Sequence, residues 1–350
     1  MKNRLLHLDG LRGLLAVSVV LGHWLGSRLG WGNVNFMHSY ISVDGFFILS
    51  GFVLAYVYGD KIKQKKISLV KYSFHRLARL YPLHILTLLM TYCIYKIFFG
   101  AMPFAAPFET FIYNIFLLHG MGLAESWNWN DPSWSISVEF FASVLALPFL
   151  IKIRSNVTLA AIAAVGYILV TSVHHNLMAA TDLHLYFFSS GFLKSVSGMA
   201  LGVMTMNMVK SSSKKSANNP LCTFVQAAEI LIISFFIYTK MSITSYDLII
   251  VIAFTHLLYS LTTNETTFKK ILSSQIISGL GKISFSVYLI HTPIMLLLDQ
   301  ISSYSSAGFY TQTAIFMTTL TITSIITYNF FEIITYNFLK NKIDNSRRIK

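Results

Sequence analysis

The chain has 350 residues, of which 54% are hydrophobic and 12% are charged. This composition leaves more apolar surface than one soluble core can bury, so it excludes an ordinary soluble domain and indicates a polytopic membrane protein. The net charge of +13 is explained by membrane topology, and the basic loops are expected to contact anionic lipids rather than nucleic acid.

Apolar runs of roughly 17–25 residues predict ten membrane-spanning helices. In chain order they cover residues 11–29, 41–59, 80–99, 134–151, 157–174, 185–209, 221–239, 246–263, 279–299 and 309–339. The first is too long for the core of a signal peptide and is expected to remain as an anchor, and the last is long enough to bend. With both termini in the cytoplasm, the loops on the inner side carry most of the Lys and Arg residues, as the positive-inside rule requires. The sequence therefore predicts an all-α membrane domain at 1–340 and a short basic cytoplasmic tail at 341–350.

Arg12 and His23 lie eleven positions apart in the first predicted helix. Eleven steps of 100° return to within about 20° of the starting direction, so both side chains share one helix face about 16 Å apart along the axis. Such groups are costly in hydrocarbon, and we expect both to face a polar interior. For Arg12 the alternative is a structural ion pair with Asp9.

A group of cations lies near the predicted cytoplasmic face. It consists of Arg12, Arg76, Arg79 and Lys282. Arg76 and Arg79 share one helix face just before Pro82, where two planar guanidinium groups suit a clamp for phosphate oxygens. The alternative is a positive-inside anchor whose side chains reach the lipid headgroups.

A second polar group lies near the predicted outer face, on four different helices. It consists of His23, Asp44, Glu139 and His291. If they converge on one cavity, these imidazoles and carboxylates suit proton transfer, with a carboxylate fixing the tautomer of a histidine base. As alternatives, Asp44 caps the second helix and His291 serves only as an interhelical hydrogen-bond partner. No metal-ligand spacing such as His-Glu-x-x-His is present, so we expect no metal.

The longest predicted outer loop, about 100–133, is rich in tryptophan near its end. Trp127 and Trp129 lie beside Asn and Asp residues, and Trp134 follows at the start of the next predicted helix. These side chains suit either an aromatic belt at the membrane interface or a surface on which a sugar stacks. The sequence leaves both alternatives open.

Five motifs follow one another from the first to the ninth predicted helix. They are Leu8-Asp-Gly-Leu-Arg12-Gly with His23, Asp44-Gly-Phe-Phe-Ile-Leu-Ser-Gly-Phe52, Arg76-Leu-Ala-Arg79-Leu-Tyr-Pro82, Trp134-Ser-Ile-Ser-Val-Glu139-Phe and Leu280-Gly-Lys-Ile-Ser-Phe-Ser-Val-Tyr-Leu-Ile-His291. At these motifs the chain resembles the acyltransferase-3 family of integral membrane acyltransferases, which modify extracytoplasmic glycans. The Arg-x10-His pattern of that family falls on Arg12 and His23, and its Arg-x-x-Arg pattern falls on Arg76 and Arg79.

The resemblance implies a ten-helix O-acetyltransferase in the inner membrane of a bacterium. It implies acetyl-CoA or another acyl-CoA as cytoplasmic donor, and a hydroxyl of an extracytoplasmic or lipid-linked polysaccharide, such as O-antigen, capsule or exopolysaccharide, as acceptor. The donor phosphates would bind the cationic group and His23 would act as general base, oriented by Glu139 or Asp44. The predicted donor-binding residues are thus Arg12, Arg76, Arg79 and Lys282, and the predicted catalytic residues are His23, Glu139, Asp44 and His291. Some members carry a fused extracytoplasmic hydrolase-like domain; here we expect the membrane domain, or a separate extracytoplasmic partner, to complete the transfer.

Two other classes of protein fit parts of the same pattern. A proton-coupled transporter of a small anionic solute also needs buried His, Asp and Glu residues, but no inverted repeat or pair of broken helices stands out. A structural membrane protein would use Arg12 and His23 only for helix packing.

Overall fold

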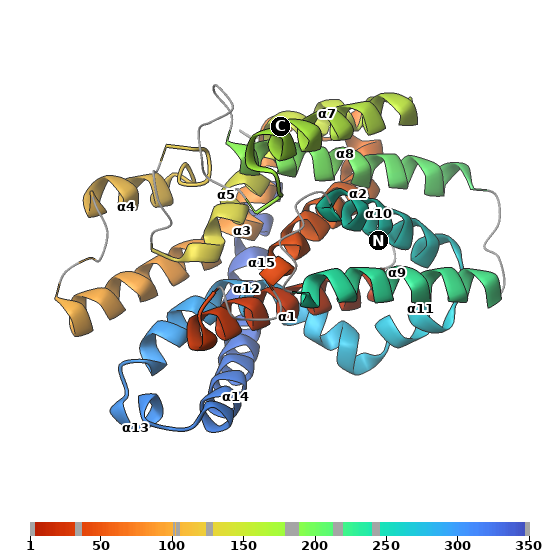
Figure 1. Cartoon of the computed structure of the whole chain (residues 1–350). Coiled ribbons are helices and arrows are strands. Elements are labelled where there is room, and N and C mark those ends of the chain that lie inside the picture. The colour runs from red at the N-terminus through yellow and green to blue at the C-terminus, as the bar shows by residue number, and fades with distance from the viewer. Residues whose placement is uncertain are drawn as a thin grey trace.

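The described part of the chain is built from helices and contains no strand (Figure 1). The computed structural model describes residues 4–31, 37–100, 102, 106–123, 129–178, 189–212, 220–239 and 246–346. The α-helices are α1 (Leu6–Leu29), α2 (Ile41–Lys63), α3 (Leu69–Ile94), α4 (Pro107–Ile115), α5 (Trp134–Phe141), α6 (Leu147–Leu150), α7 (Asn156–His174), α8 (Ser190–Ser211), α9 (Pro220–Tyr238), α10 (Asp247–Thr263), α11 (Thr267–Leu272), α12 (Gln275–Leu298), α13 (Ser302–Ser305), α14 (Phe309–Thr327) and α15 (Ile333–Asn345). Short 3-10 turns lie at Met37–Tyr40 (η1) and Asp131–Ser133 (η3), and π-helical turns at Tyr95–Phe99 (η2), Ala142–Ala146 (η4) and Tyr328–Glu332 (η6).

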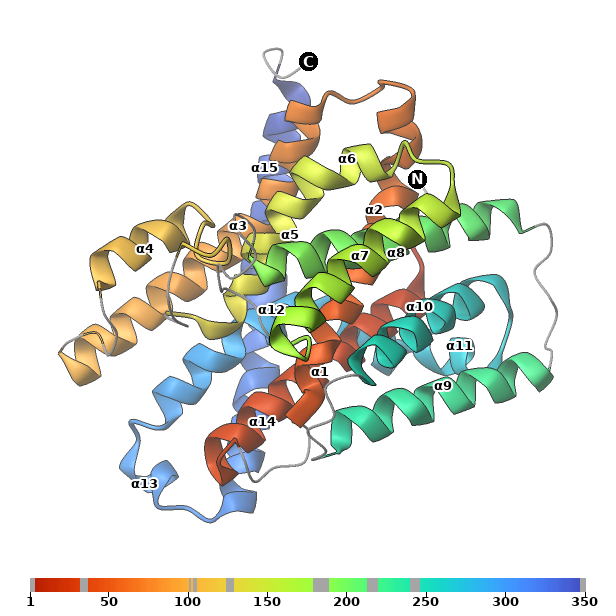
Figure 2. The same cartoon turned by 45° about the horizontal axis from the view of Figure 1, so that its top comes forward.

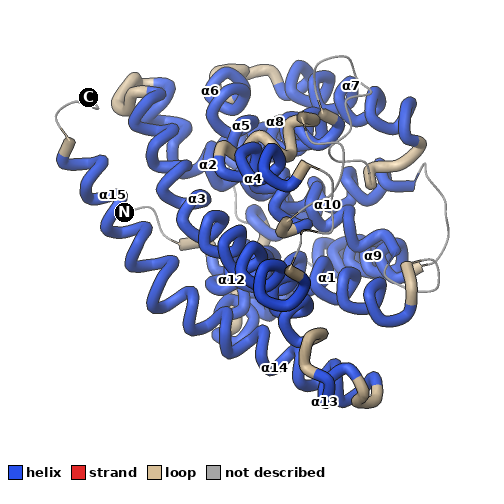
Figure 3. Tube along the Cα trace, turned by 90° about the vertical axis from the view of Figure 1, so that its left-hand side faces the viewer, coloured by secondary structure: helices blue, strands red, loops and turns tan. Residues whose placement is uncertain are grey.

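Among the described residues, nine helical stretches are long and apolar enough to cross a membrane. They overlap nine of the ten predicted segments, and the remaining segment, 246–263, corresponds to the shorter apolar helix α10. The predicted fold class is therefore confirmed. The overlong last segment is one continuous helical stretch from α14 through η6 to α15 (Figure 3).

The third predicted segment is longer in the structure than in the sequence analysis. Helix α3 begins at Leu69 rather than near residue 80, and Ser68 caps it by accepting a hydrogen bond from the Lys71 backbone N–H at 3.2 Å. Hydropathy alone places the start of this span too late, because Lys71, Arg76 and Arg79 interrupt the apolar run. As a result, Arg76 and Arg79 lie within the helix and face neighbouring helices.

Helices α1 and α12 lie in the middle of the bundle, with α9, α10 and α11 on one side and α4 on the other (Figure 2). Glycines set how closely the central helices approach each other. A Cβ atom at Gly281 of α12 would lie 1.8 Å from the backbone oxygen of Asp9 in α1, and one at Gly202 of α8 would lie 2.2 Å from that of Ile48 in α2. Small residues allow such contacts in membrane proteins, where tight packing holds the helices together.

Replacing Gly281 with alanine is expected to destabilise the protein by about 1–3 kcal/mol, because the added methyl group forces the backbones of α1 and α12 apart. Gly279→Ala in the same helix is the matched control, since nothing lies within 4 Å of its added methyl group. Thermal unfolding of the detergent-solubilised protein measures both variants. An unchanged midpoint in Gly281→Ala would contradict the close contact.

Candidate active site

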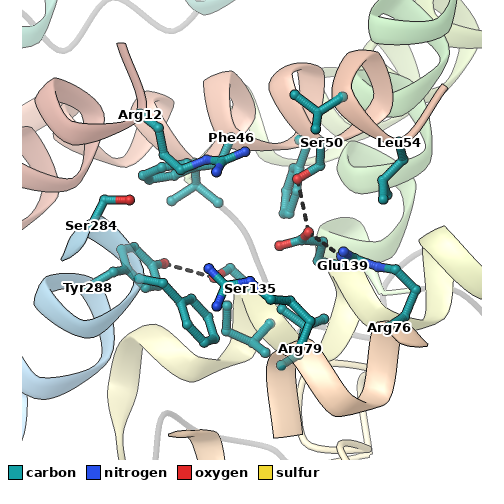
Figure 4. A pocket seen from close by; sticks show the side chains of 16 residues that line it. Arg12, Phe46, Ser50, Leu54, Arg76, Arg79, Ser135, Glu139, Ser284 and Tyr288 are labelled. Atoms are coloured by element: carbon teal, nitrogen blue, oxygen red, sulfur yellow. Dashed lines mark hydrogen bonds and ion pairs between the residues drawn. The ribbon is translucent and has the colours of Figure 1, made fainter. Parts of the chain in front are cut away.

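A cavity of about 110 Å³ lies between α1, α2, α3, α5 and α12 (Figure 4). Apolar side chains such as Phe46 and Phe47 form part of its wall. Its polar lining consists of Arg12, Ser50, Arg76, Arg79, Ser135, Glu139, Ser284 and Tyr288. The cavity therefore brings together three of the four cations that the sequence analysis assigned to donor binding.

Arg76 is held from two sides by hydrogen bonds. Its Nη2 donates to Oε1 of Glu139 at 2.7 Å, and its Nε donates to Oγ of Ser143 at 3.2 Å. Ser50 Oγ donates to the same glutamate oxygen at 2.9 Å. The side chains of Arg76 and Glu139 are only 10% and 14% exposed, so each charge depends on the other for compensation.

Arg79 is paired with Glu332, a residue that the sequence analysis did not single out. Ser286 of α12 donates to the other oxygen of this carboxylate at 2.7 Å. Glu332 is buried in the π-helical turn η6, and Ser143, the partner of Arg76, lies in the π-helical turn η4. Such turns are rare and occur often at functional sites. The only signal for Glu332 in the sequence is that it is the single acidic residue of the last predicted segment.

Arg12 extends from α1 into the cavity (Figure 4). Among the described residues, none forms a hydrogen bond or close ion pair with its guanidinium group. Asp9, which would be its partner in the alternative structural ion pair, is bonded to Arg4 at 2.5 Å. Three guanidinium groups and one carboxylate thus line the cavity, which leaves its wall net positive. A cation inside a protein without a contacting counterion favours the binding of an anion.

Lys282, the fourth predicted donor-binding cation, is not part of the cavity lining. Its side chain is exposed, whereas Ser284 and Tyr288 of the same helix line the cavity. Two steps along an α-helix turn a side chain by about 200°, so a residue two positions before Ser284 faces away from the cavity. The structure therefore does not bring Lys282 together with the three arginines of the cavity, and its role in donor binding stays a prediction.

His23 of α1 and His291 of α12 form a hydrogen-bonded imidazole pair. Nδ1 of His23 lies 2.8 Å from Nε2 of His291, and Nδ1 of His291 lies 2.7 Å from the backbone oxygen of Tyr288. A carbonyl oxygen only accepts hydrogen bonds, so Nδ1 of His291 carries a hydrogen atom. When His291 is neutral, its Nε2 then accepts from the Nδ1–H of His23. Nε2 of a neutral His23 is left unprotonated, with no hydrogen-bond partner among the described residues, and can accept a proton.

The two carboxylates that were expected to orient His23 lie against cations instead. Asp44 is fully buried, with its Oδ2 3.2 Å from Nζ of Lys194 in α8, and Glu139 is bonded to Arg76. The structure therefore pairs the two carboxylates with cations and the two imidazoles with each other, instead of bringing the four residues together. A buried carboxylate is stabilised more by a full positive charge than by a neutral imidazole. In the part of the chain that the structure describes, no three His, Cys, Asp or Glu side chains are grouped to hold a metal ion.

Tyr288 connects the cavity with the imidazole pair. Its phenol lines the cavity and lies 2.8 Å from Oγ of Ser135, while its backbone oxygen accepts the hydrogen bond from His291. Arg12 and His23 are about 16 Å apart along α1 by helix rise. The arginines and the imidazole pair are thus two separate parts of one candidate site, with Tyr288 between them.

Two of the three tryptophans near the end of the outer loop, Trp129 and Trp134, are described by the structure, and both are buried. Trp129 is 4% exposed, and its Nε1 donates to Oγ1 of Thr110 at 3.1 Å. Trp134 is 7% exposed and lies edge to face against Phe47. Trp127 lies outside the described residues. Both described side chains are core residues, so neither forms an aromatic belt or a sugar-stacking surface.

The fold and the site together define a multi-pass membrane protein with a cationic cavity near a hydrogen-bonded histidine pair. The chain belongs to the acyltransferase-3 family, because the family model described as an acyltransferase domain matches residues 5–328. This match confirms the resemblance carried by the five motifs. The chain accordingly carries the acyltransferase domain of this family over nearly its whole length.

Two curated relatives match parts of the chain. "Protein 2 in picA locus" of Rhizobium radiobacter is 42% identical over 85 residues, which cover 24% of this chain and 42% of the relative. "Acyltransferase MdmB" of Streptomyces mycarofaciens is 32% identical over 109 residues, which cover 29% of this chain and 25% of the relative. The chain thus spans less than half the length of either relative. No solved structure gives a significant match.

Proposed function

We propose that this membrane acyltransferase transfers an acetyl group from cytoplasmic acetyl-CoA to a hydroxyl group of an extracytoplasmic or lipid-linked polysaccharide. The observation that carries the proposal is Arg12, which faces the cavity beside Arg76 and Arg79 and has no contacting counterion among the described residues. Acetyl-CoA carries phosphate groups, and planar guanidinium groups bind phosphate oxygens through paired hydrogen bonds. The positive-inside rule puts this cationic part of the site nearer the cytoplasm, where the donor is available.

The imidazole pair supplies the base that the acceptor requires. An alcohol is a weak nucleophile until its proton is removed, and the tautomer of His23 leaves Nε2 free to take that proton. The hydroxyl oxygen attacks the thioester carbonyl, the C–S bond breaks, and the proton passes from His23 to the departing thiolate. The products are an acetyl ester and coenzyme A with a free thiol. The sequence contains no Gly-x-Ser-x-Gly motif, which favours direct attack over a covalent acyl-enzyme.

The donor must reach from the arginines to His23. The cavity admits an anionic group rather than a whole acetyl-CoA, and the Tyr288 ring lies on the path, with its centroid 6.2 Å from that of His291. We therefore expect the Tyr288 side chain to move aside when the pantetheine arm of the donor binds.

Replacing Arg12 with alanine is expected to weaken acetyl-CoA binding about 10–100-fold, because a hydrogen bond to a charged group contributes roughly 1.5–3 kcal/mol. Lys282→Ala is the matched control, since it removes an exposed cation of α12 that does not line the cavity. Binding of radiolabelled acetyl-CoA to the purified protein measures the affinity of both variants. An equal loss of affinity in both would mean that general surface charge, and not the cavity, attracts the donor.

The complete reaction is tested by supplying radiolabelled acetyl-CoA and crude envelope polysaccharide to the purified protein. Labelled ester on the polysaccharide supports the proposed function. Uptake of an anionic solute into proteoliposomes, without any ester formation, would support the transporter instead. Donor binding without transfer to any glycan would contradict the proposed acceptor.

A further inference from the structure

Trp31 lies just beyond the end of α1, next to His23. The two rings are arranged edge to face, with their centroids 5.8 Å apart. The Trp31 side chain is 52% exposed, whereas the other described tryptophans, Trp24, Trp129 and Trp134, are all buried. Among the described tryptophans, Trp31 alone combines an open surface with contact to the proposed base.

Two glycines hold the Trp31 ring in this place. Gly30 has a φ of +84°, which reverses the chain at the end of α1, and its N–H donates to the backbone oxygen of Gly26 at 3.1 Å. Gly26 leaves room for the ring, because a Cβ atom there would lie 2.6 Å from Cε3 of Trp31. The chain thus folds Trp31 back over α1 toward His23, instead of extending it away from the helix.

The position of this indole ring defines the kind of ligand that fits beside the base. The ligand needs an apolar face that packs on an aromatic surface and a hydroxyl group at its edge within reach of Nε2 of His23. A pyranose ring has both, because its C–H groups gather on one face and pack against the negative face of an aromatic ring, while its hydroxyl groups point outward.

We propose that Trp31 forms an acceptor subsite, on which a pyranose ring of the glycan stacks so that one hydroxyl group meets His23. This inference rests on the proposed function, because it requires a sugar acceptor. The subsite lies at the opposite end of the candidate site from Arg12, so donor and acceptor approach from different directions. Trp31 acts as a positioning residue, and the proton transfer itself belongs to His23.

The experiment uses full-length protein in detergent, radiolabelled acetyl-CoA, and methyl glycosides of glucose, galactose and mannose as soluble pyranose probes. Sorbitol, which has hydroxyl groups but no ring face, is the comparison acceptor. Trp31→Ala is expected to raise KM for the best pyranoside about tenfold with little change in kcat, since loss of one aromatic contact changes affinity by about that factor. The KM for acetyl-CoA and the activity toward sorbitol should stay unchanged, and Trp31→Phe should restore most of the loss.

Gly26→Ala provides a second test that keeps the tryptophan. Its added methyl group displaces the ring, so it should raise KM for the pyranoside as Trp31→Ala does. Tyr310→Ala is the matched control, because Tyr310 is 86% exposed at the start of α14 and its ring packs against Phe309, away from the two histidines of the candidate site. Its kinetics should equal those of the wild type.

The outcomes separate the subsite from the proposed function. An unchanged KM for the pyranoside in Trp31→Ala would overturn the subsite and leave Trp31 as an anchor at the membrane interface, while the proposed function would stand. Failure of the wild type to esterify any pyranoside, despite transfer to sorbitol, would overturn the subsite and the glycan acceptor together. A raised KM in Trp31→Ala and Gly26→Ala, but not in Tyr310→Ala, supports the subsite.

Discussion

Replacing His23 with alanine is expected to lower the rate of acetyl transfer by about 10²–10⁴-fold, which is the usual contribution of a general base. The reason is the tautomer that its neighbours impose. The backbone oxygen of Tyr288 fixes the hydrogen on Nδ1 of His291, and Nε2 of His291 in turn fixes the hydrogen on Nδ1 of His23. In the wild type only Nε2 of His23 is then left to accept a proton, because Nε2 of His291 already accepts the hydrogen bond from His23.

The measurement is single-turnover transfer from radiolabelled acetyl-CoA, with donor affinity determined separately. Donor affinity should stay near the wild-type value in His23→Ala, because the arginines of the cavity are untouched. His256→Ala is the matched control: this histidine of α10 pairs with Glu229 and belongs to neither part of the candidate site. Full transfer activity in His23→Ala would end the general-base assignment.

Variants of His291 test whether it positions His23. His291→Ala removes the acceptor for the Nδ1–H of His23 and should lower kcat, although less than His23→Ala does. His291→Gln places an amide oxygen near the same point and should recover part of the loss. If His291→Ala and His291→Gln were equally slow, the hydrogen bond between the two rings would not explain the effect.

The helices were predictable because hydrophobicity and length determine a membrane span without reference to the rest of the fold. The predicted bounds differ from the structure where charged residues lie inside a membrane-spanning helix. Helix α3 was predicted to start too late, since Arg76 and Arg79 interrupt its apolar run, and these arginines are tolerated there because Glu139 and Glu332 neutralise them. Neither partner lies near the arginines in the sequence.

Part of the candidate site was also predictable, because it depends only on the geometry of a single helix. The sequence places Arg12 and His23 on one face of one helix, and the helical repeat alone is enough for that. It does not show how neighbouring helices are rotated, so it could not show that Asp44 meets Lys194. The pairing of Arg79 with Glu332 also depends on a π-helical turn, which changes the direction of the side chain and leaves no clear mark in the sequence.

Replacing Glu139 with alanine is expected to destabilise the protein by about 3–5 kcal/mol, because it leaves the charge of Arg76 in the interior without its partner. Glu139→Gln should cost less, since its amide oxygen still accepts from Arg76 and Ser50. Lys210→Ala is the matched control: it breaks an ion pair with Asp60 in which both side chains are more than 40% exposed, and such pairs contribute about 0–1 kcal/mol. Thermal unfolding in detergent measures all three variants.

The same variant also tests what the cavity binds. Removing Glu139 takes away the only carboxylate among the described residues that lines the cavity beside its three arginines. The phosphates of a bound donor would then neutralise part of the positive charge that Glu139 neutralised in the wild type. Acetyl-CoA should therefore raise the unfolding midpoint of Glu139→Ala by more than it raises that of the wild type, because a ligand that binds more tightly stabilises the folded state more at the same concentration. Coenzyme A should act in the same way, since it carries the same phosphates. An equal shift in both proteins would mean that the donor phosphates do not bind beside Arg76, and the donor would then have to be placed elsewhere in the bundle.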